Sequence, residues 1–180
     1  DPLREHSADV VRALRAQGLQ LAILSGDRHA AALQVARQLG LDEASVQAPL
    51  LPEQKLQAIA ALRQQGLVAM VGDGVNDTPA LARADIGIAM GAAGSAAALE
   101  TADIALMQDD LRRLPELVSL SQRTHHVLAQ NIIIALGLKA VVMGLTLAGL
   151  GTLWMAVLAD AGAALLVVLN GLRLLGAKAP

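Results

Sequence analysis

Two carboxylates and an amide stand within one short, glycine-containing stretch near the middle of the chain. Residues 72–81 read Gly-Asp-Gly-Val-Asn-Asp-Thr-Pro-Ala-Leu and directly follow an apolar run, residues 67–71. Such a run is typical of a buried strand, so Asp73 and Asp77 are expected at its carboxyl end, where open parallel sheets bind ligands. Carboxylate oxygens suit Mg²⁺, and the two glycines let the backbone approach a phosphoryl oxygen. The stretch favours magnesium and phosphate chemistry over an ordinary turn.

Two other short motifs supply the remaining groups that a phosphate site needs. Ser25-Gly26-Asp27 follows an apolar run, and Lys55 stands near the start of a helix that Pro52 introduces. Phosphoryl transfer depends on hydrogen-bond donors, a fixed cation and a metal ion placed around the phosphate. Alone, Ser-Gly-Asp is usually a turn and a helical lysine is usually a solvated charge. Their order and spacing with the Asp73 loop indicate one shared crevice.

The elements that must position these motifs alternate between helix and strand over residues 1–110. Helices are predicted at 6–17, around Ala31–Leu39, at 52–65 and after Ser95, and strands at 19–24, 67–71, 86–90 and 104–107. Strands that alternate with helices predict a parallel sheet with right-handed crossovers.

The apolar excess of the chain lies in its last third. Hydrophobic residues make up 54% of the sequence, and residues 140–159 contain no charge. Residues 127–150 and 152–174 are each long enough to cross a bilayer, which takes about 20 apolar residues. The alternative is a buried helical hairpin in a soluble core. Pro115, upstream, predicts either a kink or a fresh helix start.

The charges that flank these spans predict their orientation. Arg123 precedes the first span, and Arg173 and Lys178 stand at the end of the second, whereas the connecting loop has no charge. By the positive-inside rule, both ends of the hairpin and the polar domain face the cytoplasm of a multi-pass protein in the cell membrane.

Composition excludes several other classes of protein. The net charge of −2, without a basic stripe interleaved with aromatics, argues against a nucleic-acid partner. The absence of cysteine excludes a disulfide framework, and the N-terminus lacks a signal-peptide pattern. Because the first residue is Asp1 rather than Met, we expect a processed chain or a fragment.

The three polar motifs together resemble a known family. Residues 23–27, 52–55 and 70–77 are similar to the later part of the phosphorylation domain of P-type ATPases, which belong to the haloacid dehalogenase superfamily. Residues 131–139 and 153–175 resemble the last two membrane helices of the heavy-metal-transporting branch. The resemblance implies an α/β, haloacid dehalogenase-like fold with a Rossmann-type parallel sheet. It divides the chain into part of the phosphorylation domain (1–110), a linker helix (111–126) and two transmembrane helices (127–175).

The resemblance also implies roles for individual residues. Ser25 and Lys55 would hold the phosphoryl group, and Asp27 would support the placement of ATP and phosphate. Asp73 would bind Mg²⁺ with help from Asp77. The expected catalytic set is Ser25, Gly26, Asp27 and Lys55, and the expected cofactor-binding set is Asp73, Gly74, Asn76 and Asp77.

The family's nucleophile is missing from this sequence. It is an aspartate in an Asp-Lys-Thr-Gly-Thr motif that forms an aspartyl phosphate, and the motif does not occur in the 180 residues. The nucleotide-binding and actuator domains and six earlier membrane helices are also absent. We therefore expect the C-terminal segment of a pump that depends on a missing N-terminal part. The isolated chain should be inactive, and its sheet should have a gap where the nucleophile's strand belongs.

Two charges lie inside the predicted membrane spans. Counted from a turn near residue 150, Lys139 lies roughly 17 Å and Asp160 roughly 14 Å along its helix, so they reach similar depth. Charges inside a membrane are costly and often functional, so the pair is either a structural ion pair or a site for a transported ion. The surrounding residues resemble zinc, cadmium and lead exporters, which implies a divalent metal as the transported partner.

Two other functions remain open from the sequence. One is a haloacid dehalogenase-type phosphatase tethered by a membrane hairpin, and the other is a non-catalytic relic with a regulatory role. Sequence upstream of this chain would separate them.

Overall fold

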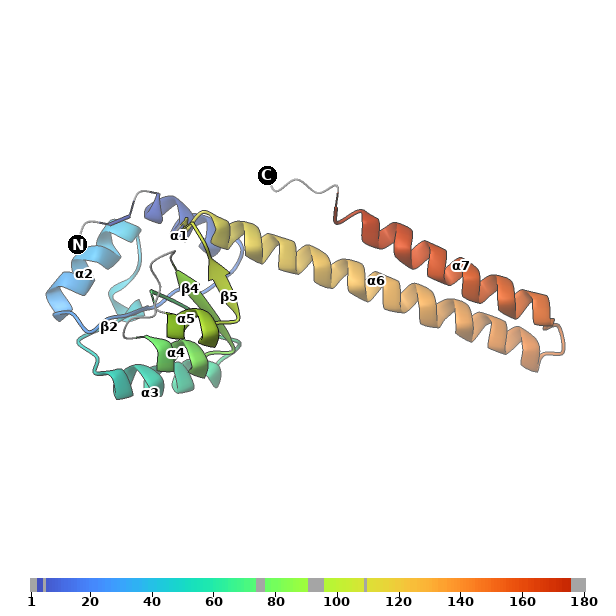
Figure 1. Ribbon diagram of the computed structural model, residues 1–180, viewed down its shortest axis with the longest axis horizontal. Helices are drawn as coiled ribbons and strands as arrows, with labels where there is room; N and C mark the ends of the chain where they lie inside the picture. The colour runs from blue at the N-terminus through green and yellow to red at the C-terminus, as the bar shows by residue number, and fades with distance from the viewer. Residues whose placement is uncertain (1–2, 5, 74–76, 91–95, 109, 176–180) are drawn as a thin grey trace. The chain divides into compact units, whose positions relative to one another are not determined.

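The computed structural model describes residues 3–4, 6–73, 77–90, 96–108 and 110–175. The chain divides into two compact units, residues 1–115 and 116–180. The elements are shown in Figure 1. In chain order they are α1 (Ser7–Ala16), β1 (Ile23–Leu24), α2 (His29–Leu39), a 3-10 turn η1 (Glu43–Ser45), β2 (Val46–Gln47), α3 (Pro52–Arg63), β3 (Ala69–Gly72), α4 (Thr78–Arg83), β4 (Ile86–Met90), α5 (Ala96–Thr101), β5 (Ile104–Leu106), α6 (Arg113–Leu147) and α7 (Leu153–Leu172).

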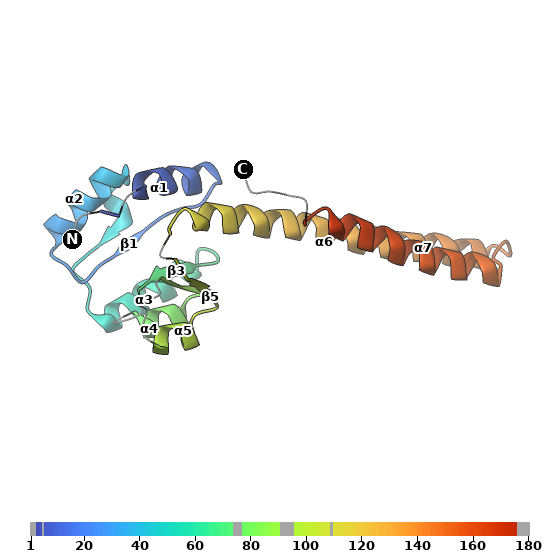
Figure 2. The ribbon, with the colours of Figure 1, turned by 45° about the horizontal axis from the view of Figure 1, so that its top comes forward.

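The described strands of the first unit form two parallel sheets. One has the order β1-β2 and the other has the order β3-β4-β5. Figure 2 shows β1 beside α1 and α2, and β3 and β5 beside α3, α4 and α5. The parallel α/β architecture is confirmed. β1 and β3 each pair with a described strand on one side only, and the gap expected between them stays a prediction.

Each sheet has its own small core. Ala32 and Ala36 of α2 pack with Val46 of β2, and all three are buried. In the other sheet, Leu81 of α4 packs with Ala89 of β4 and with Ala98. Four of these six buried residues are alanines, and their small side chains let the helices approach the strands closely.

Two strands are shorter or shifted relative to the sequence-based expectation. The strand predicted at 19–24 is reduced to Ile23–Leu24, because β2, its only described partner, is two residues long. The sequence analysis did not predict β2. The strand predicted at 67–71 begins at Ala69, and Leu67 is 90% exposed. The strand at 86–90 is confirmed, and the one at 104–107 ends a residue early.

A carboxylate ties the amino ends of β3 and β4 together. Asp85 Oδ2 accepts a hydrogen bond from the Val68 amide at 3.0 Å, and Asp85 Oδ1 lies 2.6 Å from Nη2 of Arg63 in α3. The hydrogen bond from Val68 and the Arg63 guanidinium hold the pKa of Asp85 below its usual value of 3.8. This contact lies at the strand ends opposite the Asp73 loop.

The helices of the first unit match the expected segments closely. α2 ends at Gly40, whose φ of 70° is the left-handed conformation that favours glycine at this position. α3 starts at Pro52 as predicted and ends two residues before the predicted limit. A Pro at the first helical position is favourable because that amide has no helical partner.

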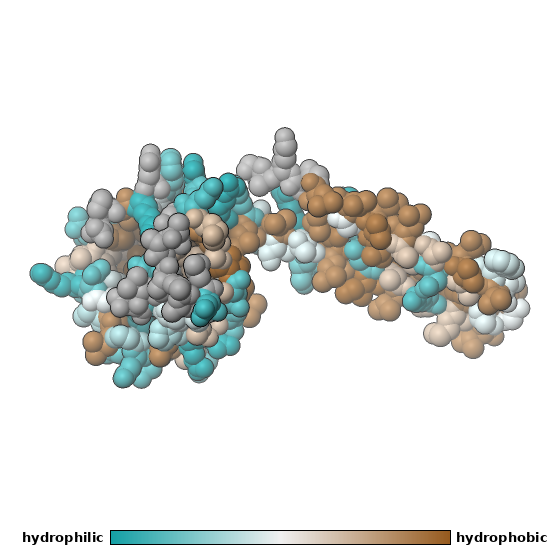
Figure 3. Space-filling model, in the orientation of Figure 1, coloured by the Kyte–Doolittle hydropathy of each residue, from teal (hydrophilic) through white to brown (hydrophobic). Residues whose placement is uncertain are grey.

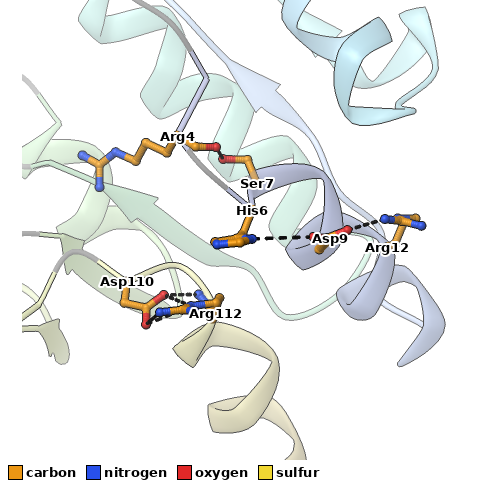
Figure 4. A network of polar contacts seen from close by, with 7 residues as sticks. All are labelled: Arg4, His6, Ser7, Asp9, Arg12, Asp110 and Arg112. Carbon is orange, nitrogen blue, oxygen red and sulfur yellow. Dashed lines mark hydrogen bonds and ion pairs between the residues drawn. The ribbon is translucent and has the colours of Figure 1, made fainter.

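The start of α1 is fixed by local polar contacts (Figure 4). Ser7 Oγ donates to the carbonyl oxygen of Arg4 at 2.7 Å. His6 Nδ1 lies 3.8 Å from Asp9 Oδ2, and Arg12 pairs with the same carboxylate. These residues are sequence neighbours, so the contacts account for the helix start without a ligand.

α6 resolves the ambiguity at Pro115. The helix starts at Arg113, so Pro115 lies in its first turn, where the missing N–H removes no helical hydrogen bond. Just before it, Asp110 accepts hydrogen bonds from the Arg112 side chain at 2.9 Å, also drawn in Figure 4, which lowers the pKa of Asp110. The helix therefore starts two residues before Pro115 rather than at Pro115 itself, the position predicted for a fresh start.

The second unit is a helical hairpin of α6 and α7. Both helices are long and apolar enough to cross a membrane, with window hydropathies of 1.8 and 1.9. Their large apolar side chains are exposed, as Figure 3 shows over both helices; Ile133 is 71% exposed and Leu158 69%. By length and composition, both helices fit the predicted membrane spans.

Candidate functional site

Three of the expected site segments follow the carboxyl end of a strand or begin a helix. Ser25 comes directly after β1, and Asp73 directly after β3. Lys55 lies in the first turn of α3, where its amide donates to the carbonyl of Leu51 at 3.0 Å. Asp77 is the residue before α4, and its carbonyl accepts from the Leu81 amide at 2.8 Å. Strand ends and helix starts are where α/β folds collect phosphate ligands.

Lys55 and Asp77 form the best-defined contact of the candidate site. Lys55 Nζ lies 2.7 Å from Asp77 Oδ1, although the residues are 22 positions apart. Their side chains are only 15% and 19% exposed. This ion pair joins the start of α3 to the start of α4 and places a cation and a carboxylate beside the end of β3.

Gly72 makes room for Asp77 at the end of β3. A Cβ atom on Gly72 would lie 3.1 Å from Asp77 Cβ and 3.2 Å from Asp77 Oδ2, closer than most side chains approach. The sequence analysis assigned this glycine to a close approach of phosphate. In the structure, the space beside it is occupied by the Asp77 carboxylate.

The Ser25 loop is held by its own hydrogen bonds and by the segment after β2. Ser25 Oγ donates to Asp27 Oδ2 at 3.1 Å and accepts from the Asp27 amide at 3.1 Å. The Ser25 amide donates to the Gln47 carbonyl at 3.1 Å, and the Leu50 amide donates to the Ser25 carbonyl at 2.8 Å. A hydroxyl and a carboxylate are thus presented on a fixed backbone.

The structure therefore brings the expected residues together as two pairs. Ser25 contacts Asp27, and Lys55 contacts Asp77; no hydrogen bond or ion pair between described residues joins one pair to the other. Gly26 is exposed, and a Cβ there would lie 3.4 Å from the Leu50 carbonyl oxygen. Gly74 and Asn76 lie outside the described residues.

The chemistry of the donors fits Mg²⁺. Asp73 is exposed at the end of β3. Asp77 follows shortly after it in the sequence, and its carboxylate forms an ion pair with Lys55. Carboxylates are hard oxygen ligands, and Mg²⁺ commonly uses one or two of them and completes its shell with water and phosphate oxygens. The described residues contain no cluster of three or more His, Cys, Asp or Glu.

The hairpin contains a second polar pair. Lys139 Nζ of α6 lies 3.2 Å from Asp160 Oδ1 of α7, so the two charges reach the same depth, as the residue count predicted. Both side chains are largely exposed in this chain, 63% and 73%.

Sequence reasoning missed a polar cross-link between the same two helices. Asn170 Nδ2 donates to Asn131 Oδ1 at 2.9 Å and to Gln130 Oε1 at 3.2 Å, and Asn170 Oδ1 accepts from Arg173 at 3.1 Å. The signal for this cross-link in the sequence was that two apolar segments, about 40 positions apart, each contain polar amide side chains.

Comparisons with known proteins find a matching family model and similar proteins. A family model described as haloacid dehalogenase-like hydrolase matches residues 1–85. The chain is 46% identical over 179 residues to the cadmium/zinc-transporting ATPase HMA2 of Arabidopsis thaliana. It is 49% identical over 175 residues to the zinc/cadmium/lead-transporting P-type ATPase of Escherichia coli strain K12. These matches cover 99% and 97% of this chain but only 19% and 23% of the relatives.

Solved structures lead to the same family. The crystal structure of a zinc-transporting PIB-type ATPase in the E2.Pi state matches 97% of this chain, with a TM-score of 0.91 and 48% identity, over 28% of its own length. The catalytic domain CopB-B of a CPx-ATPase matches 64% of the chain, with a TM-score of 0.58 and 36% identity. The chain thus spans about a fifth to a quarter of its relatives. Over almost its whole length, the chain matches a segment of heavy-metal-transporting P-type ATPases in both sequence and fold.

Proposed function

We propose that this chain is part of an ATP-driven exporter of divalent heavy metals, zinc, cadmium or lead. The observation that carries the proposal is the contact between Lys55 and Asp77 at the end of β3, 2.7 Å long and largely withdrawn from water. It gathers a cation and a carboxylate beside Asp73, which is the arrangement that a magnesium-bound phosphoryl group requires. The zinc, cadmium and lead transporters among the relatives support the choice of substrate.

The residues of the first unit have separate tasks in this proposal. Lys55 offers a fixed positive charge to phosphoryl oxygens. Ser25 lies in a loop anchored by Gln47, and its hydroxyl proton would turn from Asp27 to a phosphoryl oxygen when phosphate binds. Asp27 orients that hydroxyl, and Asp73 holds Mg²⁺ with Asp77 beside it. When bound, Mg²⁺ would neutralise negative charge on the oxygens of phosphate and ATP.

The acceptor of the phosphoryl group is proposed to come from a part of the protein outside these 180 residues. β1 and β3 each have one described partner strand, so each leaves an edge to which a further strand could add. A strand inserted between them would bring a nucleophilic aspartate to the same carboxyl edge as Asp73. An unpaired strand edge favours such an addition, because its amide and carbonyl groups gain hydrogen bonds.

In the second unit, Lys139 and Asp160 are proposed to form the site for the transported ion. Asp160 offers oxygen ligands, and Lys139 neutralises it when no metal is bound. The hairpin is proposed to cross the cell membrane with both ends and the phosphorylation domain in the cytoplasm, as its flanking arginines favour.

A chimera tests the proposal directly. This chain replaces the matching 175-residue segment of the Escherichia coli zinc/cadmium/lead-transporting ATPase, and zinc tolerance is measured in cells that lack the native pump. We expect the chimera to restore tolerance and Asp73→Asn to abolish it, because the amide is a far weaker magnesium ligand. Arg37→Gln, an exposed change on α2, is the matched control and should retain tolerance. A chimera that is correctly inserted but gives no tolerance contradicts the proposal.

A tethered phosphatase is the alternative that the hydrolase family model keeps open. It predicts magnesium-dependent hydrolysis of a small phosphate ester by the purified chain, lost in Asp73→Asn. The pump proposal predicts neither hydrolysis nor an acid-stable phosphoprotein from the chain alone, because the acceptor carboxylate is not in it.

A further inference from the structure

A groove with several basic side chains in its lining lies at the end of the hairpin where the two apolar segments start and finish. It is formed by the first half of α6 and the residues that end α7, and its volume is about 580 Å³. Small-molecule sites occupy about 300–1,000 Å³, so the groove is large enough for a phosphate-bearing head group. All of its lining belongs to the second unit.

The lining of the groove is basic. Arg123 and His126 contribute from α6 and Arg173 from the end of α7, and none of the described lining residues is acidic. Arg123 has no ion pair among the residues that the structure describes. Two guanidinium groups with no carboxylate in the lining give the groove a net positive charge, which favours binding of an anion.

Hydrogen bonds between the helices fix one side of this groove in place. Arg173 Nη1 donates to Asn170 Oδ1 at 3.1 Å, and the Asn170 amide donates to Asn131 and Gln130 across the hairpin. The position of Arg173 is therefore tied to α6 rather than left to a free side chain. Such preorganisation reduces the entropy lost on ligand binding.

The other side of the groove combines polar side chains with apolar ones. His126 Nδ1 donates to the carbonyl oxygen of Gln122 in the preceding turn at 3.1 Å, and Ser119 Oγ donates to the Glu116 carbonyl at 3.0 Å, so both side chains are held in place. Val127 and Leu174 add apolar surface. A polar rim beside apolar side chains suits an amphiphile better than a soluble anion.

We infer that this groove binds the phosphate of an anionic phospholipid in the cytoplasmic leaflet. The inference rests on the membrane placement of the hairpin in the proposed function. Arginine side chains bind phosphate oxygens in pairs through their planar forks, and basic pockets between membrane helices on the cytoplasmic side hold anionic head groups. In this geometry Arg123 and Arg173 contact the phosphate from α6 and α7, and the acyl chains continue along the apolar helices.

Native mass spectrometry of the full chain tests the inference. The chain is released from detergent that contains equal amounts of phosphatidylglycerol and phosphatidylcholine, and the ratio of the two bound lipids is measured. The wild-type chain should retain phosphatidylglycerol selectively. Arg123→Gln combined with Arg173→Gln should reduce that ratio at least about tenfold, since each basic residue near an anionic surface contributes about fivefold. Arg37→Gln removes an equal charge from α2 and should leave the ratio unchanged.

Further variants distinguish a specific lipid site from nonspecific electrostatic attraction of anionic lipid. Arg123→Gln alone, which breaks no described ion pair, should lower the ratio even if the double variant fails to fold. Replacing both arginines with lysine keeps the charge but removes the forks, so the ratio should fall between those of the wild-type and glutamine variants. A lysine variant equal to wild type, or no selectivity in wild type, overturns the inference. Loss of phosphatidylglycerol on addition of inorganic phosphate identifies a soluble anion as the ligand and also overturns it.

Insertion distinguishes this inference from the function on which it depends. If the chain is not integrated into phosphatidylcholine vesicles, as judged by extraction at high pH, the membrane placement itself fails. If it is integrated but binds both lipids equally, only the lipid site fails.

Discussion

Lys55 and Asp77 depend on each other because both side chains are largely withdrawn from water. Their exposed fractions are 15% and 19%. The pair is therefore intermediate between a surface ion pair, which contributes little to the free energy of unfolding, and a buried pair, whose disruption strongly destabilises the fold. Gly72 lets the carboxylate lie against the strand, so the backbone as well as the lysine fixes its position. At this scale, a structural contact and a proposed catalytic contact are the same interaction.

We expect Lys55→Met and Asp77→Asn each to destabilise the first unit by about 1–2 kcal/mol, because each leaves a partly buried group without its partner. The double variant should lose about 1 kcal/mol less than the sum of the single changes. Urea unfolding of the full chain, followed by circular dichroism, measures these differences. The exposed pair Asp9 and Arg12 is the control, with a coupling below about 0.5 kcal/mol. Additive effects at Lys55 and Asp77 would contradict the contact.

Asp85 gives a prediction for pH dependence. Its pKa is lowered in the folded chain by the Val68 amide and the Arg63 guanidinium, so the folded state favours the charged form. The resulting stabilisation is complete above the unfolded-state pKa and is lost as the pH falls through the folded-state pKa. The melting temperature of Asp85→Asn should therefore be lower than that of wild type at pH 7, and the difference should shrink below about pH 4. A difference that is constant from pH 7 to pH 2 would exclude the charged interaction.

At the scale of elements, small residues decide how closely helices approach the strands. α4 lies over β4 so tightly that a Cβ on Gly87 would be 2.8 Å from the carbonyl oxygen of Leu81. The amide of the same glycine donates to Asp103 Oδ2 at 2.8 Å, which ties β4 to the segment before β5. This packing supports α4, and Asp77 is the residue directly before that helix.

Gly87→Ala should destabilise the first unit by about 1–3 kcal/mol, because backbone rather than a flexible side chain blocks the added methyl group. Gly66→Ala is the matched control. A Cβ there meets no atom within 4 Å, so the change should stay within about 0.5 kcal/mol. Melting temperatures of both variants check the contrast, and equal effects would mean that α4 is not held against β4 as described.

At the scale of the whole molecule, the two units present two separate polar sites. The first unit holds the candidate phosphate site, and the second holds the pair Lys139 and Asp160 in otherwise apolar helices. In a pump, further parts of the protein outside this chain would couple the two sites. The relatives have room for such parts, since they are about four to five times as long as this chain.

Exchanging the two hairpin charges separates the roles proposed for them. In the chimera, Asp160→Ala should abolish zinc-stimulated ATP hydrolysis but leave phosphorylation by inorganic phosphate intact, because that reaction belongs to the first unit. The combined change Lys139→Asp and Asp160→Lys keeps the attraction but moves the carboxylate to the other helix. We expect no recovery of zinc stimulation. Recovery would show that the pair is only structural and would refute the ligand assignment.

The sequence by itself indicated most of the elements and the family resemblance but not the contacts. The helix predicted at 52–65, the helix around Ala31–Leu39 and the strand at 86–90 followed from apolar periodicity and from Pro and Gly signals, which act locally, and the structure has them at 52–63, 29–39 and 86–90. The motifs at Ser25, Lys55 and Asp73 carried the resemblance that the comparisons confirmed.

Only the tertiary structure decided which residues meet. The pairing of Lys55 with Asp77, the division into two sheets and the two-residue strand β2 depend on segments far apart in sequence, where local propensity carries no information. The same holds for Asn170, which appears in the sequence as one amide in an apolar run. Its bonds to Asn131 and Gln130 arise because the turn after α6 brings two helices side by side, and a polar group in apolar surroundings is stabilised by any partner within reach.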